Sequence, residues 1–167
     1  NIKSLVINAD KNADNKVIYV NVDDSAAEDK KVNQAGKLVV NAEDDVTFTI
    51  IETFKGTEGV AGNTAFRTLI DAGKNSHVKL VQVFLQPKEQ DVLSDIGSRC
   101  ADEAGFELVQ LFLGEGSLYD GIRTDLKGNK SEFICNIGYF GVDKQNIDIN
   151  LISNHIGKKT NCEIGVD

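Results

Sequence analysis

A regular alternation of apolar and polar residues constrains this chain more than any other feature. In Val46–Phe54, the apolar residues at positions 46, 48 and 50 alternate with threonines at positions 47 and 49. Successive side chains of a β-strand point to opposite faces of a sheet, so the pattern predicts a strand with one buried face and one wet face. An acidic tetrapeptide separates this strand from Lys37–Asn41. We therefore predict a hairpin here.

Two more pairs of β-branched segments have turn residues between them. Ser4–Ala9 and Val17–Val22 are separated by a spacer rich in Asp and Asn. Ile122–Leu126 and Ser131–Phe140 flank the turn sequence Lys127–Lys130. Asn, Asp and Gly are the residues that tight turns favour, so each pair predicts a further antiparallel hairpin.

One segment has the signals of a helix. Pro87 suits a first helical turn and Gly105 suits the end, which predicts one clear helix at about 88–104. The apolar residues on one side of this helix are Val92, Leu93, Ile96 and Cys100. Thr64–Ala72 fits either a short helix or a strand.

These elements predict an α+β fold that is predominantly antiparallel β, of sandwich or barrel type. Leu80–Leu85 and Leu108–Leu113 are nearly identical in sequence, and both are apolar enough to be central strands covered on both faces. A duplicated helix–strand unit and chance explain this echo equally well, and the first supports an alternative α/β fold with a central βαβ unit. We predict one domain over 1–167, with 1–34 as an extended arm or an edge hairpin.

Composition excludes several partners. The net charge of −8 repels nucleic acid and anionic lipid surfaces, and no apolar run is long enough to span a membrane. The chain contains no methionine and begins at Asn1, which predicts a processed protein of extracellular or virion origin.

Two acidic turns have the residue types of a calcium site. Asp10, Asn12 and Asp14 occupy alternate positions, as the ligands of a calcium loop do. The late bidentate carboxylate of such a loop is missing, and a turn rich in Asp and Asn explains the same residues without metal. A second acidic turn would share an ion if the fold brought the two together: Glu43, Asp44 and Asp45.

Cysteine chemistry leaves two alternatives. Cys100, Cys135 and Cys162 are odd in number and widely spaced, with no Cys-x-x-Cys motif. This excludes a four-cysteine metal site and leaves either three buried thiols or one disulfide with one free thiol.

No local motif predicts an enzyme. Gly56–Thr64 comes nearest to a phosphate-binding loop, but its glycine spacing is one residue too long. Asn63 stands where such a loop needs lysine, and Glu58 would repel phosphate. Gly114–Ser117 lacks the spacing of a nucleophile elbow. We predict a protein without catalytic activity.

The leading functional hypothesis is a structural, self-assembling protein. Val46–Phe54 and its acidic turn resemble the opening of many extracellular and virion sandwich domains. A tail-tube, coat or decoration protein, or a secreted filament subunit, would bind a second copy or another protein. One alternative is a calcium-binding adhesion or stress-response module, and another is an α/β ligand-binding or nucleotide-related domain.

Overall fold

The computed structural model describes residues 3–23, 31–142 and 144–167. Within them the chain forms twelve strands, one 3-10 turn (η1, Lys11–Ala13) and no α-helix. The strands are β1 (Lys3–Ala9), β2 (Val17–Asp23), β3 (Lys31–Ala42), β4 (Thr47–Lys55), β5 (Ala61–Ala72), β6 (His77–Leu85), β7 (Gln90–Cys100), β8 (Gly105–Phe112), β9 (Leu118–Leu126), β10 (Glu132–Tyr139), β11 (Ile147–His155) and β12 (Asn161–Val166).

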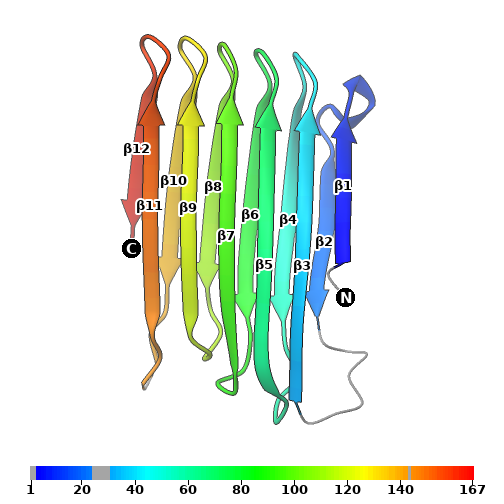
Figure 1. The fold of residues 1–167 in the computed structure, drawn as a ribbon, viewed down its shortest axis with the longest axis vertical. Helices are drawn as coiled ribbons and strands as arrows, with labels where there is room; N and C mark the ends of the chain where they lie inside the picture. The colour runs from blue at the N-terminus through cyan, green and yellow to red at the C-terminus, as the bar shows by residue number, and fades with distance from the viewer. Residues whose placement is uncertain (1–2, 24–30, 143) are drawn as a thin grey trace.

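The strands alternate between two facing parallel sheets (Figure 1). Sheet A has the order β1-β3-β5-β7-β9-β11, and sheet B has the order β12-β10-β8-β6-β4-β2. Each strand pairs with the strand two places along the chain, so the polypeptide winds as a β-solenoid. The advance from one coil to the next lies between 26 residues (Asp95 to Gly121) and 33 residues (Ser4 to Lys37).

The predicted hairpins and the antiparallel sandwich are wrong. β3 and β4, which the sequence predicts to pair, lie in opposite sheets, and so do β1 and β2 and also β9 and β10. A tight turn between two alternating strands is equally suited to carry the chain from one sheet to the other. Either arrangement buries one face of each strand, so the local pattern does not distinguish them.

The predicted helix at 88–104 is also wrong, because β7 occupies most of that segment. Its buried positions are every second residue, and three of them are Gln90, Ser94 and Ser98. These polar residues on the inner face concealed the two-residue period from the sequence. Thr64–Ala72 lies within β5, so the α/β alternative fails, although β6 and β8 do run parallel.

Aromatic rings pack along the interior between the sheets. Phe54 and Phe84 stack with their centroids 4.6 Å apart, and Phe112 follows Phe84 at 4.9 Å. All three are buried, and burial of one such side chain stabilises a fold by about 1.5–3 kcal/mol. Phe106 and Phe133 form a second stack at 5.4 Å.

Turns of similar shape stack at one end of the solenoid. Each contains one non-glycine residue with a left-handed φ: Asn15, Asp45, Asn75, Glu103, Lys130 and Lys159. Neighbouring turns are joined through acidic and amide side chains. Asp44 accepts a hydrogen bond from the backbone N–H of Lys74 at 2.7 Å, and Asp102 accepts one from Asn129 at 2.6 Å. The Asn, Asp and Gly residues that suggested hairpins therefore lie in these stacked turns, which we call the turn column.

The sequence echo is one repeat of the solenoid. Leu80–Phe84 of β6 lies in register against Leu108–Phe112 of β8, residue by residue. The prediction for 1–34 stays open because residues 24–30 lie outside the described part. Within the described part of that segment, β1 pairs with β3 and β2 pairs with β4. None of the described segments forms a helix that could cross a membrane.

Candidate functional site

Six polar side chains form a connected group inside the solenoid, between the two sheets. Three come from one inward-facing ladder of sheet B, and three come from sheet A. We call this group the buried polar chain, and its members are Thr68, Glu52, Gln82, Gln110, Asp120 and Ser94. Such groups are costly to bury unless they are hydrogen-bonded, so their contacts decide what the interior can do.

Hydrogen bonds run through the buried polar chain from end to end. Glu52 accepts one bond from the Thr68 hydroxyl at 2.8 Å and one from the Gln82 amide at 2.7 Å. The Gln110 amide donates to Gln82 at 2.8 Å and to Asp120 at 2.8 Å. Two carboxyl groups are thus linked through two glutamine side chains.

Both carboxyl groups titrate near neutral pH. Burial raises the pKa of Glu52 to about 7, against the hydrogen bonds from Gln82 and Thr68, which lower it. Burial also raises the pKa of Asp120 to about 6, against hydrogen bonds from Ser94 and Gln110. Desolvation penalises the ionised form of a carboxyl group, and this penalty dominates here.

Two oxygens of the buried polar chain lack a donor among the described residues. They are Oε1 of Gln110 and Oδ1 of Asp120, and both are buried. An ionised carboxylate only accepts hydrogen bonds, whereas a protonated one also donates. Protonation of Asp120 therefore adds a hydrogen-bond donor to a region in which acceptor oxygens outnumber donors.

The arrangement also fixes the alignment of the coils. Apolar side chains tolerate a slip of two residues, because the same face stays buried. Glu52, Gln82 and Gln110 bond to one another only when they share one ladder. We interpret the buried polar chain as a device for register, since an out-of-register coil leaves buried polar groups unpaired.

The three cysteines are free thiols. Cys100 and Cys135 are buried and Cys162 is half-buried. Burial raises the pKa of both Cys100 and Cys135 to about 12, so these two stay protonated at neutral pH. A thiol in that state is a poor nucleophile and a poor metal ligand.

The two acidic turns of the calcium hypothesis do lie side by side, because Glu43 N–H donates to the Ala9 carbonyl oxygen at 2.9 Å. Their oxygens already accept internal bonds. Asp10 accepts from the Asn12 backbone at 2.8 Å, and Asp14 accepts from the Thr47 backbone at 2.9 Å. Asp44 and Asp45 bind the next turn, at Lys74 and Asn75.

In the described part of the chain, no three or more His, Cys, Asp or Glu side chains are gathered closely enough to hold a metal ion. Nothing in the structure tests calcium binding itself, so calcium binding by these turns stays a prediction.

The glycine-rich segment 56–64 comprises the bend after β4 and the first residues of β5. Gly62 has φ +152°, and a Cβ there would lie 1.6 Å from the Val32 carbonyl oxygen. The side-chain amide of Gln90 donates to the Val60 carbonyl oxygen at 2.9 Å. Close packing of neighbouring coils explains Gly62 without a bound phosphate.

The outer face of sheet A carries ion pairs between neighbouring strands. Arg67 pairs with Asp95 at 2.6 Å between β5 and β7, and Arg99 pairs with Asp71 at 2.6 Å between the same strands. A groove of about 590 Å³ crosses this face. Both small residues and larger apolar side chains line it: Ala35, Ala65, Gly121, Leu93 and Tyr119.

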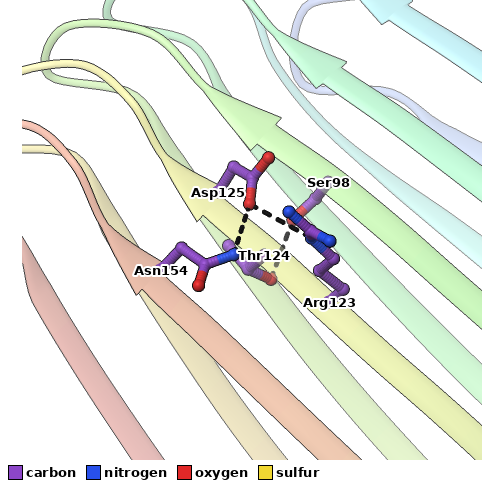
Figure 2. Close-up of polar contacts among 5 residues, drawn as sticks. All are labelled: Ser98, Arg123, Thr124, Asp125 and Asn154. Carbon is purple, nitrogen blue, oxygen red and sulfur yellow. Dashed lines mark hydrogen bonds and ion pairs between the residues drawn. The ribbon is translucent and has the colours of Figure 1, made fainter.

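Figure 2 shows one end of sheet A, where polar side chains occupy both faces of the strands. Asp125 accepts a bond from Asn154 at 2.7 Å and pairs with Arg123 at 3.3 Å. The Asn154 amide, followed by Arg123, holds the pKa of Asp125 below its usual range. The buried Ser98 hydroxyl donates to Thr124 at 2.9 Å on the inner side.

The sequence contained a signal for the buried polar chain that residue-type patterns alone did not reveal. Glu52, Gln82 and Gln110 each stand two residues before a phenylalanine, and the last two lie within otherwise apolar runs. A polar residue at the same place in three central strands indicates a shared interior ladder. Nothing local predicts Asp120, which joins the chain from the opposite sheet.

Parallel strands wound into two sheets, with polar side chains bonded through the interior, define a β-solenoid domain. Residues 24–166 match the family described as SUF system FeS cluster assembly, SufBD core domain. The chain belongs to this family. No curated protein and no solved structure matches the chain.

Family membership overturns the leading functional hypotheses. A SufBD core domain takes part in iron–sulfur cluster assembly, so the virion, filament and calcium-dependent adhesion hypotheses are wrong. The extracellular or virion localisation is wrong as well, because the SUF system is cytoplasmic. SufBD domains work in a complex with other Suf proteins, which confirms the prediction of a protein partner.

Proposed function

We propose that this chain is a non-catalytic scaffold module of the iron–sulfur cluster assembly machinery. The match to the SufBD core domain over residues 24–166 is the observation that carries the proposal. The solenoid supplies a rigid frame, since every described strand is hydrogen-bonded to at least one neighbour. Iron and sulfide are the cargo of the machinery in this view, and the frame positions the proteins that handle them.

The state of the interior supports a scaffold role. The two buried thiols are protonated at neutral pH, and the two buried carboxyl groups are engaged with internal donors. The outer faces differ in chemistry: sheet A carries cross-strand ion pairs, whereas several outward residues of sheet B are exposed aliphatic and aromatic side chains. Two unlike surfaces on one rigid body can bind two unlike partners.

Disruption of the gene in the source organism tests the proposal. We expect a severalfold loss of activity in iron–sulfur enzymes under iron limitation, and no loss in a dehydrogenase without a cluster. A plasmid copy of the gene should restore both growth and activity. Unchanged activity of every iron–sulfur enzyme under iron limitation would contradict the proposal.

The scaffold role makes a second prediction about the chain itself. After anaerobic incubation with iron and sulfide and removal of unbound ions, we expect the isolated protein to retain no cluster absorption. A variant with all three cysteines replaced by serine is the matched control, and it should give the same spectrum. A cluster band in the wild-type protein that the triple variant lacks would show that the thiols bind the cargo.

A further inference from the structure

Two groups of the buried polar chain meet across the interior through only one pair of their atoms. Gln110 lies on the inner face of β8 and Asp120 on the inner face of β9, and they are 0% and 4% exposed. Gln110 Nε2 donates to Asp120 Oδ2 at 2.8 Å. The other oxygens of the same two groups, Gln110 Oε1 and Asp120 Oδ1, have no hydrogen-bond partner among the described residues. Two unpaired acceptors therefore belong to side chains that are already in contact.

The orientation of the Gln110 amide follows from its neighbours. Its Nε2 carries two hydrogens, of which one goes to Asp120 and the other to Gln82 Oε1 at 2.8 Å. A flipped amide would place an oxygen between two acceptor oxygens, so the observed orientation is the favourable one. Gln110 Oε1 is thus a buried acceptor that needs a donor, and leaving it unpaired is unfavourable.

An ionised Asp120 cannot supply that donor, because a carboxylate only accepts hydrogen bonds. A proton taken up from solvent by Oδ1 converts this oxygen into a donor and removes the negative charge. We propose that protonated Asp120 donates from Oδ1 to Gln110 Oε1 and so forms a cyclic pair of two hydrogen bonds with the amide, which opens when Asp120 ionises. We call this pair the acid–amide clamp. It is a pH-sensitive link between the sheets, because β8 belongs to sheet B and β9 to sheet A.

The surroundings of Asp120 favour the protonated acid. Its register neighbours are Ser94 of β7 and Ile149 of β11, and neither side chain is charged. The buried side chains of the described part of the chain include no lysine or arginine that would stabilise a carboxylate. The titratable groups that act on Asp120 or connect to it from other strands are neutral thiols or acids: Asp95 of β7, Cys135 of β10 and, through the two glutamines, Glu52 of β4.

The clamp makes the contact between the sheets depend on pH. Burial already raises the pKa of Asp120 to about 6, and a bond donated by the neutral acid favours that form further. The stabilisation is fully present below the ordinary pKa of an aspartic acid and is lost as the pH rises through the folded-state pKa. Above that pH, the junction of β8 with β9 retains one bond and brings two unprotonated oxygens together.

Infrared spectroscopy detects the proposed proton directly. Glu52→Gln serves as the background, so that the other raised carboxyl group gives no signal. We expect the carbonyl band of a protonated acid at about pH 6, where exposed carboxyl groups are ionised, and its loss by about pH 9. Addition of Asp120→Asn should remove the band at every pH. Absence of the band from the background protein at about pH 5.5 would overturn the proposal.

Gln110→Met in the same background tests the partner of the proton, since methionine is similar in length but has no amide. The acid band should move to higher frequency, because Oδ2 no longer accepts from Nε2 and the Oδ1 hydrogen loses its acceptor. An unchanged band would show that protonated Asp120 does not bind Gln110, which contradicts the clamp.

Stability measurements test the clamp without spectroscopy. Asparagine at position 120 imitates the closed clamp, because its amide donates to Gln110 Oε1 and its oxygen accepts from Nε2, but it does not titrate. Between about pH 4 and the folded-state pKa, the unfolding constant of the Glu52→Gln background should rise about tenfold per pH unit relative to the protein that also carries Asp120→Asn. With a pKa of about 6, the total is on the order of a hundredfold, with no further change at higher pH.

Asp125→Asn is the matched control, because Asp125 lies on the same strand and its pKa is below the usual range. Its effect on the unfolding constant should be the same at every pH above about 4. Denaturant unfolding at a series of pH values measures all three proteins. Parallel curves for the background and Asp120→Asn between about pH 4 and pH 7 would overturn the clamp. These outcomes are independent of the iron–sulfur proposal, which is tested by enzyme activities.

Discussion

Glu52 shows how a single buried carboxyl group makes the stability of this protein depend on pH. It is fully buried, and its pKa is raised to about 7 by desolvation. The folded state therefore binds this proton more tightly than the unfolded chain does. The contribution is fully present below the ordinary pKa of a glutamic acid and is lost as the pH rises through 7.

We expect the free energy of unfolding to fall by about 3 kcal/mol between pH 4.5 and pH 8 relative to Glu52→Gln. Glutamine imitates the protonated acid toward Thr68 and Gln82 but does not titrate. Denaturant unfolding at a series of pH values measures the difference between the two proteins. Glu43→Gln, on the surface, should leave the wild-type pH dependence intact; parallel curves for wild type and Glu52→Gln would contradict the prediction.

The thiols should differ sharply in reactivity. Cys162 is half-buried, whereas Cys100 and Cys135 are buried and have a raised pKa. We expect one equivalent of a thiol reagent to react quickly with the native protein and two more only after denaturation. Mass spectrometry should place the first label on Cys162. Rapid labelling of a second cysteine in the native state would count against the buried positions.

Single elements depend on close contact between successive turns. Gly128 lies against the previous turn, and a Cβ on it would lie 2.0 Å from the Ala101 carbonyl carbon. At Gly141, by contrast, a Cβ would meet nothing within 4 Å. The first glycine is needed for the stacking of the turns, and the second is not.

We expect Gly128→Ala to lower the free energy of unfolding by about 3 kcal/mol, because the turn has to move away from its neighbour. Gly141→Ala is the control and should change it by less than about 0.5 kcal/mol. Thermal and denaturant unfolding measure both. Equal stability of the two variants would show that the turn column tolerates a side chain at Gly128.

Most strands could be found from the sequence, but their partners could not. Val78–Leu85 and Phe106–Leu113 are predicted strands and correspond closely to β6 and β8. Paired residues of neighbouring strands lie 26 to 33 positions apart in the sequence. The alternation of apolar and polar residues within one strand does not indicate which strand is its partner. Ser94 and Ser98 on the inner face of β7 weakened the alternation enough to favour a helix instead.

The candidate site was harder to predict than the strands. Gln82 and Gln110 stand out within apolar runs, and the echo already aligns them. The other-sheet members of the buried polar chain, Thr68, Ser94 and Asp120, lie at sequence distances that only the winding of the chain determines. A buried interaction across two sheets is therefore invisible until the coil length is known.

The molecule as a whole should unfold from its ends. Each coil contacts only its neighbours, so the central strands have partners on both sides while the edge strands β1, β2, β11 and β12 have a partner on one side among the described strands. In repeat architectures, stability is the sum of such nearest-neighbour contacts. Local opening is therefore easiest at the edges.

Hydrogen exchange measured by mass spectrometry tests this gradient. We expect the amides of β5 to β8 to exchange at least tenfold more slowly than those of β1 and β12. Lowering the temperature should slow all segments and preserve their order. Uniform exchange along the chain would indicate that the solenoid opens as one cooperative unit.

The constant inward face of the coils limits how such a gene can change in size. Deleting one residue inside a strand would move every following side chain of that strand to the opposite face of the sheet. The apolar side chains among them would then be exposed to solvent. Extra residues can be accommodated at the bends, and whole coils can be duplicated without disturbing the ladders on either side. Related genes of different length should therefore differ by multiples of about one winding, or by insertions confined to the bends.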